Sequence, residues 1–293
     1  MIPVTIGICA YNESENIERA IKSVYDQKLS DISIERVLVI SSESTDGTDE
    51  IVLNLMKKFS DLKLIPQKKR EGKNSAVNLL LDEKTTEIVV LLNADNAFND
   101  ENTLNNLLRP LFDSKVGIVG GRPTPTNNPK DLVGFATHML WTMHHHISLI
   151  YPKIGELVAF RDIGTRLPLG TQSDEDILRM KLEARGFKSV YAPDAIILNR
   201  GPETVSDFIK QRTRVNIGER YMKRNFDYDI PTWDKKFLMN ALINVTKDLG
   251  FHPFKIIFAV TLESISRLKA VSYVSSNDGD INIWEPVKTT KKL

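Results

Sequence analysis

Acidic side chains stand at two places where regular elements are expected to end or begin. Asp95 follows the apolar run Val89–Leu92, and Asp174, Glu175 and Asp176 precede a segment with helical spacing of apolar residues. A carboxylate at the end of a buried strand can bind a divalent cation, and one at the start of a helix can accept a proton from a hydroxyl group. The first place is therefore a candidate metal site and the second a candidate proton acceptor. Acidic residues in a first helical turn are also favoured by the helix dipole alone, so the rest of the chain must decide.

Three further junctions join an apolar run to polar residues. They are Cys9–Ser14, Ile40–Thr48 and Arg70–Asn78. Backbone amides at the start of a helix favour phosphate, and Lys73 adds a positive charge to the third junction. Each junction also has a plain structural interpretation, because short polar side chains such as Asn12 can simply cap a helix.

The elements that must position these residues follow a strand–helix rhythm. Short runs rich in β-branched residues alternate with stretches of helical spacing, and the runs are Val4–Cys9, Val37–Ile40, Leu62–Ile65 and Ile88–Leu92. Buried runs separated by helices predict parallel strands joined by right-handed crossovers, in a doubly wound, nucleotide-binding type of α/β sheet. Because ligands collect at the carboxyl ends of such strands, we expect the polar junctions to meet at one edge.

The second half of the chain is organised differently. The prolines and asparagines of residues 122–129 predict a loop after the strand at 116–121. Beyond it we expect a helix at 132–150, an extended segment at 156–160, a helix at 174–185, a strand at 188–191 and mainly helices over 206–274.

Composition excludes several classes of function. The 293 residues include 39 lysines and arginines against 38 aspartates and glutamates, so the weak overall field gives no reason to expect a nucleic-acid partner. The single cysteine, Cys9, excludes an internal disulfide framework and fits a reducing compartment. We see no secretory signal and no run of about 18 apolar residues, so we expect a cytoplasmic protein that does not cross a membrane.

In this order the junctions resemble the signature segments of family 2 glycosyltransferases of the GT-A fold. The turn at 10–13 resembles the family's P-x-Y-N-E-type turn, with Ala10 where proline is usual. The stretch 44–48 matches the end of the family's V-D-D-G-S-x-D-G-T segment, while Ser41 and Ser42 replace its two aspartates. Arg70–Asn78 resembles its G-K-x-x-A-x-N helix start, and residues 93–95 read N-x-D where D-x-D is normal.

The resemblance continues over the acidic cluster and covers residues 3 to about 220. Counting back from 185–187, which resembles R-G-[WFY], places the family's base-bearing pair on Asp174 and Glu175 in reversed order, with Asp176 one residue beyond. Which carboxylate is the base stays open. Residues 210–215 resemble the Q-x-x-R-W signature without its tryptophan, so Gln211 and Arg214 are expected to contact the diphosphate or the acceptor. Arg161 is expected to share that role.

The resemblance implies a metal-dependent, inverting glycosyltransferase of the hexosyltransferase type, with a nucleoside diphosphate sugar as donor. Asp95 would hold Mg²⁺ or Mn²⁺, and UDP is slightly favoured over GDP. The residues expected to bind the nucleotide sugar are Ala10, Tyr11, Asn12, Glu13, Ser42, Lys73, Asn93, Ala94 and Asp95. Two alternatives stay open, namely a catalytically silent sugar-nucleotide- or glycan-binding domain and a sugar nucleotidyltransferase.

The expected organisation is a catalytic domain over 1–225, followed by a helical extension with a polar tail over 226–293. The catalytic domain divides into a nucleotide-sugar half, 1–121, and an acceptor half, 122–225. The apolar segment 251–260 in the extension suggests peripheral membrane contact and a lipid-linked acceptor, against a soluble glycan. Alternatively the same face packs on the catalytic domain or on a second subunit, which would give a homo-oligomer. The consecutive histidines His144–His146 are expected to point in three directions.

Overall fold

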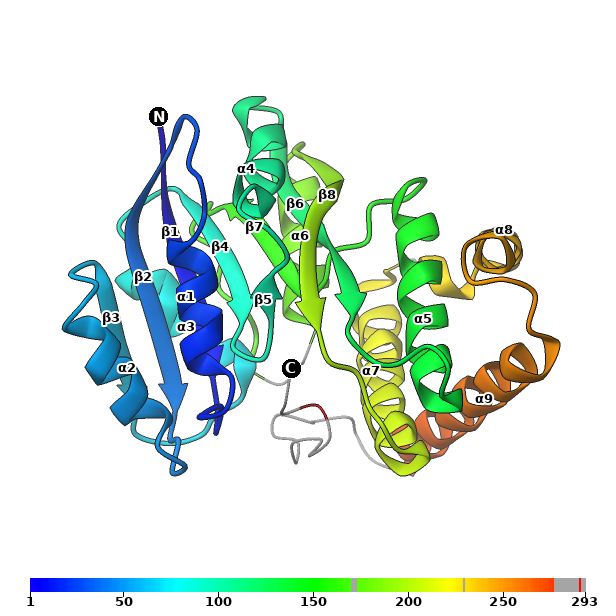
Figure 1. Cartoon of the computed structure of the whole chain (residues 1–293). Helices are drawn as coiled ribbons and strands as arrows, with labels where there is room; N and C mark the ends of the chain where they lie inside the picture. Colours follow the sequence, from blue (N-terminus) through cyan, green and yellow to red (C-terminus); the bar gives the residue numbers. More distant parts are fainter. Residues whose placement is uncertain (170–172, 229, 277–289, 291–293) are drawn as a thin grey trace.

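The computed structural model describes residues 1–169, 173–228, 230–276 and 290. Its strands form one sheet in the order β3-β2-β1-β4-β7-β6-β8-β5 (Figure 1). The strands are β1 (Ile2–Ala10), β2 (Ile32–Ser42), β3 (Leu62–Gln67), β4 (Ile88–Asn93), β5 (Ala97–Phe98), β6 (Val116–Pro125), β7 (Leu157–Arg161) and β8 (Lys188–Asn199). The helices are α1 (Ile17–Tyr25), α2 (Thr48–Met56), α3 (Lys73–Glu83), α4 (Thr103–Leu108), α5 (Leu132–Ser148), α6 (Asp174–Glu183), α7 (Val205–Phe226), α8 (Lys235–Asp248) and α9 (Pro253–Ser276), with short 3₁₀ turns η1 (Arg109–Phe112) and η2 (Pro231–Trp233).

The sheet is mostly parallel, as the sequence predicts. Strands β3, β2, β1 and β4 run parallel to one another, and β6 runs parallel to β8. Strand β7 lies antiparallel between β4 and β6, and β5 lies antiparallel to β8. The carboxyl ends of β1, β2, β3 and β4 therefore lie at one edge of the sheet, together with the amino end of β7.

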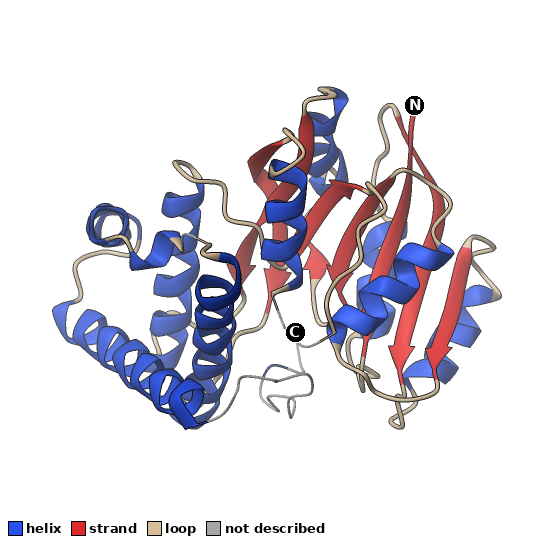
Figure 2. Ribbon diagram, turned by 180° about the vertical axis from the view of Figure 1, so that it is seen from behind, coloured by secondary structure: helices blue, strands red, loops and turns tan. Residues whose placement is uncertain are grey.

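Two apolar layers cover the two faces of the sheet. Along β4, Ile88, Val90 and Leu92 pack on the layer that α1, α2 and α4 complete, whereas Val89 and Leu91 pack on the layer with α3 and α6. This alternation follows from the period of two in a strand, and burial on both faces explains the unbroken apolar run. Figure 2, seen from behind, shows the face that α3 and α6 cover.

A third apolar cluster joins the helical extension to the rest of the chain. Its buried members come from α5, α7, α8 and α9 and include Phe135, Phe208, Val245 and Leu262. The four helices lie together beside the sheet at the right of Figure 1. The division at residue 225 stays a prediction, but α8 and α9 share a core with two helices that precede it.

One element differs from the sequence-based expectation. Residues 122–125, expected as a loop, continue β6 and pair with β8 from Arg122 opposite Ile196 to Pro125 opposite Asn199. Prolines fit there because β6 pairs with β7 only over residues 118–120, so the ladder has ended on the other side of the strand before the first proline. Strand β8 is correspondingly longer than the expected 188–191.

Hydrogen bonds of a buried asparagine, Asn127, join the segment that follows β6 to the segment that precedes α7. The side chain of Asn127 donates to the carbonyl oxygens of Gly201 and Pro202 and accepts from the amide of Gly201 at 2.7 Å. All three groups lie away from solvent. The link holds the two chain segments together before α7 turns towards the sheet edge.

Asn127→Ala is expected to lower the free energy of unfolding by about 2–4 kcal/mol, because it leaves a buried amide and buried carbonyls without their partners. Urea titration followed by circular dichroism measures the loss. The neighbouring Asn128→Ala is the matched control, since Asn128 is exposed and its side chain accepts only from the amide of Lys130. Equal unfolding midpoints for the two variants would contradict the role given to Asn127.

Candidate active site

Hydrogen bonds between side chains and backbone join the turn after β1 to the turn after β2. The amides of Asn12 and Glu13 donate to the hydroxyls of Ser44 and Thr48, and the amide of Thr45 donates to the Asn12 side chain at 2.8 Å. Asn12 adopts φ 53° in this turn, a conformation that asparagine tolerates better than most residues. The two segments that resemble family signatures therefore form one structural unit.

A second cluster surrounds the two serines that replace family aspartates. The hydroxyl of Ser41 donates to Asp49 at 2.5 Å, and the hydroxyl of Ser42 donates to Gln67 at 2.6 Å. Nearby, the guanidinium of Arg70 lies 3.8 Å from the ring centre of Tyr11. Ser41 is thus held by a carboxylate and Ser42 by a neutral amide. A nucleotide base that binds here meets hydroxyl and amide groups.

Helix α3 carries the cation of the site and fixes the loop that leads to the acidic cluster. Gly72, at φ 89°, precedes it in the left-handed region that glycine adopts readily. The Asn74 side chain donates to the carbonyl of Pro168, and Asn78 exchanges two hydrogen bonds with Leu167. These contacts place the loop before α6 against α3.

The centre of the site is one ammonium group between two carboxylates. The Nζ atom of Lys73 lies 2.8 Å from Oδ2 of Asp174 and 2.9 Å from Oε1 of Glu175. The Asp174 side chain is 1% exposed, that of Glu175 is 19% exposed and that of Lys73 is 33% exposed. Lys73 and Glu175 therefore reach solvent, while Asp174 lies behind them.

Burial and charge assign the proton within this pair. Burial, assisted by the charge of Glu175, raises the pKa of Asp174 to about 8. Burial also acts to raise the pKa of Glu175, but Lys73 and a hydrogen bond from Asp174 outweigh it and lower that pKa. Near neutral pH Asp174 holds a proton and Glu175 is ionised. The stabilising contribution of protonated Asp174 is present at low pH and is lost as the pH rises through about 8.

Asp176 lies apart from this pair. Its Oδ1 atom accepts from the hydroxyl of Tyr228 at 2.9 Å, and burial raises its pKa. Because Tyr228 follows α7 in the chain, this contact ties α6 to the segment beyond α7. The structure therefore brings Asp174 and Glu175 to Lys73, but not Asp176.

Beside the end of β4 lies Glu156, a residue that was not among the site residues expected from the sequence. Leu92 of β4 pairs with Leu157 of β7, which places Glu156 beside Asn93. The Glu156 carboxylate accepts from the side chains of Asn93 at 2.8 Å and Asn96 at 2.9 Å. Burial raises the pKa of Glu156, and the charge of Asp95 raises it further. Its position directly before an apolar run was the available signal, but only the antiparallel pairing shows which residues it meets.

The oxygen atoms at this edge suit a hard divalent cation. Asp95 is half-buried, and the Asn93 amide directs its NH₂ group to Glu156, which leaves its carbonyl oxygen as a further oxygen ligand. In the part of the chain that the structure describes, no group of three or more His, Cys, Asp or Glu side chains could hold a metal ion by itself. Such a set fits Mg²⁺ or Mn²⁺ when a diphosphate and water complete the coordination, which is the usual way Mg²⁺ is held beside a phosphate substrate.

Arg161 does not belong to this edge. It pairs with Ile88 at the opposite end of β4, and its guanidinium contacts Glu87 and the carbonyls of Val116 and Leu111. Because β7 runs antiparallel to β4, the carboxyl end of β7 lies away from the carboxyl end of β4. The diphosphate or acceptor role expected for Arg161 does not fit this position.

Gln211 and Arg214 lie on the face of α7 that turns towards α6. A Cβ atom at Gly218, on the same helical face, would come within 3.0 Å of the Ser173 hydroxyl at the start of α6. Both side chains are half-buried. Their spacing along α7 places them on the same face of the helix as Gly218, and their contacts with diphosphate or acceptor stay a prediction.

The histidines point in three directions, as their sequence spacing requires. His145 contacts the Tyr191 hydroxyl at 2.9 Å, and His146 contacts Asp248 at 2.7 Å. The ring of His144 lies 3.9 Å from the position of a Cβ atom at Gly155, next to Glu156. Burial lowers the pKa of His144 to about 3, so this ring stays neutral.

Cys9 is a packed thiol. It lies between Ile40 and Asn93 in the sheet, and burial raises its pKa to about 12. It is therefore a protonated neighbour of the site.

Comparisons with known proteins agree with this arrangement. The model of the family described as Glycosyl transferase family 2 matches residues 5–167. The poly-beta-1,6-N-acetyl-D-glucosamine synthase of Staphylococcus aureus is 25% identical over an alignment of 256 residues that covers 82% of this chain. The match spans 60% of the length of that relative.

Two solved structures share the fold. The mannosyltransferase PcManGT from Pyrobaculum calidifontis, in complex with GDP-Man and Mn²⁺, has a TM-score of 0.61 at 22% identity, over 98% of this chain and 82% of that chain. S. aureus TarS in complex with UDP-GlcNAc has a TM-score of 0.54 at 13% identity, over 94% of this chain and 93% of that chain. These likenesses confirm the GT-A fold expected from the sequence. Because the family match covers more than half of the chain, including the joined turns, the start of α3 and the end of β4, this protein belongs to glycosyltransferase family 2.

Proposed function

We propose that this protein transfers a hexosyl group from a nucleoside diphosphate sugar to an acceptor hydroxyl, with inversion at the anomeric carbon. The observation that carries the proposal is the contact of Lys73 with Asp174 and Glu175 at the sheet edge. A cation that suits a diphosphate and a carboxylate that suits a hydroxyl proton lie within hydrogen-bonding distance of each other there. A single displacement needs both groups in one cleft.

Glu175 is the base in this mechanism. Its carboxylate is ionised near neutral pH and reaches solvent, so it can accept the proton of the acceptor hydroxyl as the oxygen attacks. Protonated Asp174 lies behind Glu175 beside the same ammonium group and adds no second negative charge to the site. Lys73 stabilises the charge that gathers on the departing diphosphate, while Arg214 and Gln211 contact diphosphate or acceptor from α7. Mg²⁺ or Mn²⁺ at Asp95 would supply Lewis-acid stabilisation of the same leaving group.

The two alternatives are weaker. A silent sugar-nucleotide-binding domain would explain Ser41, Ser42 and Asn93 in place of aspartates, but it needs no buried, proton-sharing pair beside Lys73. A nucleotidyltransferase would need a triphosphate site, and the turn at 10–13 is not the glycine-rich, arginine-containing loop that such enzymes use.

The donor base is proposed to be uracil. The solved neighbours bind different nucleotides, GDP-Man in one and UDP-GlcNAc in the other. At the ends of β2 and β3, Ser42 and Gln67 offer neutral hydrogen-bonding groups. Such groups suit the carbonyl and imide of uracil, and on this ground UDP is slightly favoured over GDP.

The acceptor is proposed to be a lipid-linked glycan that the protein meets at a membrane surface. No described helix is long and apolar enough to span a bilayer. On the extension, however, Phe251, Phe254, Ile257 and Leu268 are between 66% and 76% exposed. Phe258, expected on the same face, instead packs against the third apolar cluster. The exposed stripe can insert into an interface without crossing it.

Glu175→Gln is expected to lower kcat by about 10²-fold or more while UDP binding changes little, because the substitution removes the proton acceptor. Asp176→Asn is the matched control, since Asn can still accept from Tyr228, and its kcat should stay near that of the parent protein. The released nucleoside diphosphate is measured. Full activity of Glu175→Gln, or a product that keeps the donor's anomeric configuration, would contradict this mechanism.

The pH profile separates the two carboxylates. With Glu175 as base, kcat/KM should be nearly flat from about pH 6 to about pH 7.5, because the pKa of Glu175 lies below its ordinary value. If Asp174 were the base, kcat/KM would rise about tenfold per pH unit up to its pKa of about 8. Such a rise would make Asp174 the base and Glu175 its neighbour.

Mn²⁺ is expected to strengthen UDP binding about tenfold or more, and Asp95→Ala should abolish that gain, because Asp95 is the proposed metal ligand. Calorimetric titrations of UDP and GDP, with Mn²⁺ and with EDTA, measure both effects. Asp194→Ala, at an exposed aspartate, is the control. If the affinity for UDP is the same with and without Mn²⁺, the proposed metal role is wrong. If GDP binds tightly and UDP does not bind, the proposed donor preference is reversed.

The double variant Phe251→Glu, Phe254→Glu is expected to bind anionic phospholipid vesicles at least about tenfold more weakly than the parent protein, because each phenylalanine loses favourable burial. Vesicle flotation measures the bound fraction. Phe112→Glu is the control, since Phe112 is 53% exposed on η1. A parent protein that stays with the soluble fraction would end the membrane proposal.

A further inference from the structure

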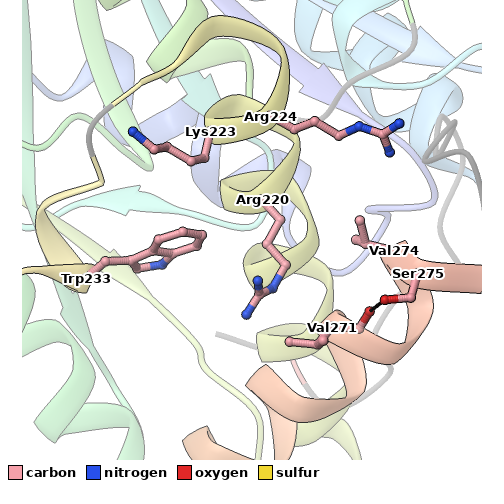
Figure 3. Close-up of a pocket in the computed structure, with 7 residues that line it drawn as sticks. All are labelled: Arg220, Lys223, Arg224, Trp233, Val271, Val274 and Ser275. Carbon is pink, nitrogen blue, oxygen red and sulfur yellow. Dashed lines mark hydrogen bonds between the residues drawn. The ribbon is translucent and has the colours of Figure 1, made fainter.

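A basic pocket with an aromatic wall lies on the outer side of α7. Its volume is about 280 Å³, and its lining comes from α7, η2 and α9. The lining residues are Arg220, Lys223, Arg224, Trp233, Val271, Val274 and Ser275 (Figure 3). Three of them are cationic and none is acidic, so the pocket favours an anion.

One nitrogen of the Arg220 guanidinium has no hydrogen-bond acceptor among the described residues. Its guanidinium lies 5.3 Å from the ring centre of Trp233, and Figure 3 shows it between Trp233 and Val271. Its Nε atom is buried, and within the described ranges no atom accepts a hydrogen bond from it. A buried donor without an acceptor is costly, and a bound oxyanion would supply the acceptor.

The other two cations extend the same site. Lys223 also forms an ion pair with Asp227, whose side chain is 92% exposed. Arg224 is exposed and, among the residues that the structure describes, has no hydrogen-bond or ion-pair partner. Because Lys223 is paired with Asp227, the charge argument rests on Arg220 and Arg224. Two guanidinium groups suit a phosphate group better than a carboxylate, because phosphate offers more oxygens and more charge.

The pocket is separate from the nucleotide site. Gly218 faces Ser173 at the start of α6, and Arg220, two residues later, points to the other side of the helix. Lys73, the cation of the nucleotide site, is not among the lining residues. Helix α7 therefore carries Gly218 on the side of α6 and Arg220 on the side of the pocket.

We propose that this pocket binds a phosphate group of a phosphorylated saccharide, with the sugar ring against Trp233. The guanidinium groups of Arg220 and Arg224 take the phosphate oxygens. The apolar faces of Trp233 and Val271 cover the carbon side of a sugar ring, and the volume admits about one such residue. That the saccharide is part of the acceptor rests on the proposed function, whereas the phosphate site itself rests only on the pocket.

Glucose 1-phosphate is the probe in a calorimetric titration, with excess UDP and Mn²⁺ present to occupy the nucleotide site. The expected result is saturable binding that glucose alone does not give. Arg220→Gln should weaken it at least about tenfold and Arg224→Gln several-fold, because each removes a charged donor. Arg109→Gln, at an exposed arginine on η1, should not change it.

Two variants keep the proposed site and the proposed function distinguishable. Lys73→Gln should weaken UDP binding and leave glucose 1-phosphate binding as it is, so failure of the nucleotide site would not remove the pocket. If Arg220→Gln fails to fold, the Arg224→Gln variant alone tests the pocket. Arg224 is exposed, so its substitution is not expected to affect folding. Absence of saturable binding, or unchanged affinity in the folded pocket variants, overturns the proposal. Another outcome is that glucose 1-phosphate does not bind, whereas vesicles of anionic phospholipid bind and lose that binding in the Arg220 and Arg224 variants. This outcome would overturn the saccharide proposal and assign the phosphate to a lipid headgroup.

Discussion

The ion pair between Lys73 and the two carboxylates of α6 is the interaction on which the site depends. Without the ammonium group, Asp174 and Glu175 would stand side by side at a buried helix start with no cation within 3 Å to balance them. Lys73 lowers the pKa of Glu175, while burial keeps a proton on Asp174. One cation therefore produces an ionised carboxylate and a neutral one from two neighbouring acids.

Helix α3 also holds the backbone of the loop that leads to α6. Asn74 and Asn78 hold the loop at residues 167–168, so this loop is fixed against α3 on the segment that follows Lys73. The amino ends of the two helices meet where β1 and β4 end, and the joined turns after β1 and β2 close the same edge. A site built on strand ends and helix starts is more rigid than one built on loops.

Substitutions at the family's acidic positions are partly balanced by other residues. Asn93 stands where the family resemblance implies an aspartate, and Glu156 from the antiparallel strand brings a carboxylate to its side chain. At the end of β2, the Asp49 carboxylate accepts from the hydroxyl of Ser41, while Ser42 donates to the neutral side chain of Gln67. A carboxyl group therefore lies beside Asn93 and another beside Ser41, whereas Ser42 has a neutral partner.

The sequence by itself determined the parallel half of the fold and the members of the main cluster. Apolar runs with helical spacers predict β1 to β4, and because parallel strands end at one edge, Asn12, Lys73, Asn93 and Asp95 had to lie there. The tertiary structure decided what depends on antiparallel pairing and helix orientation. It moved Arg161 to the far edge, brought Glu156 to Asn93, separated Asp176 from Glu175, and turned Arg220 away from the cleft. These outcomes are set by contacts between residues distant in the chain, which local periodicity does not encode.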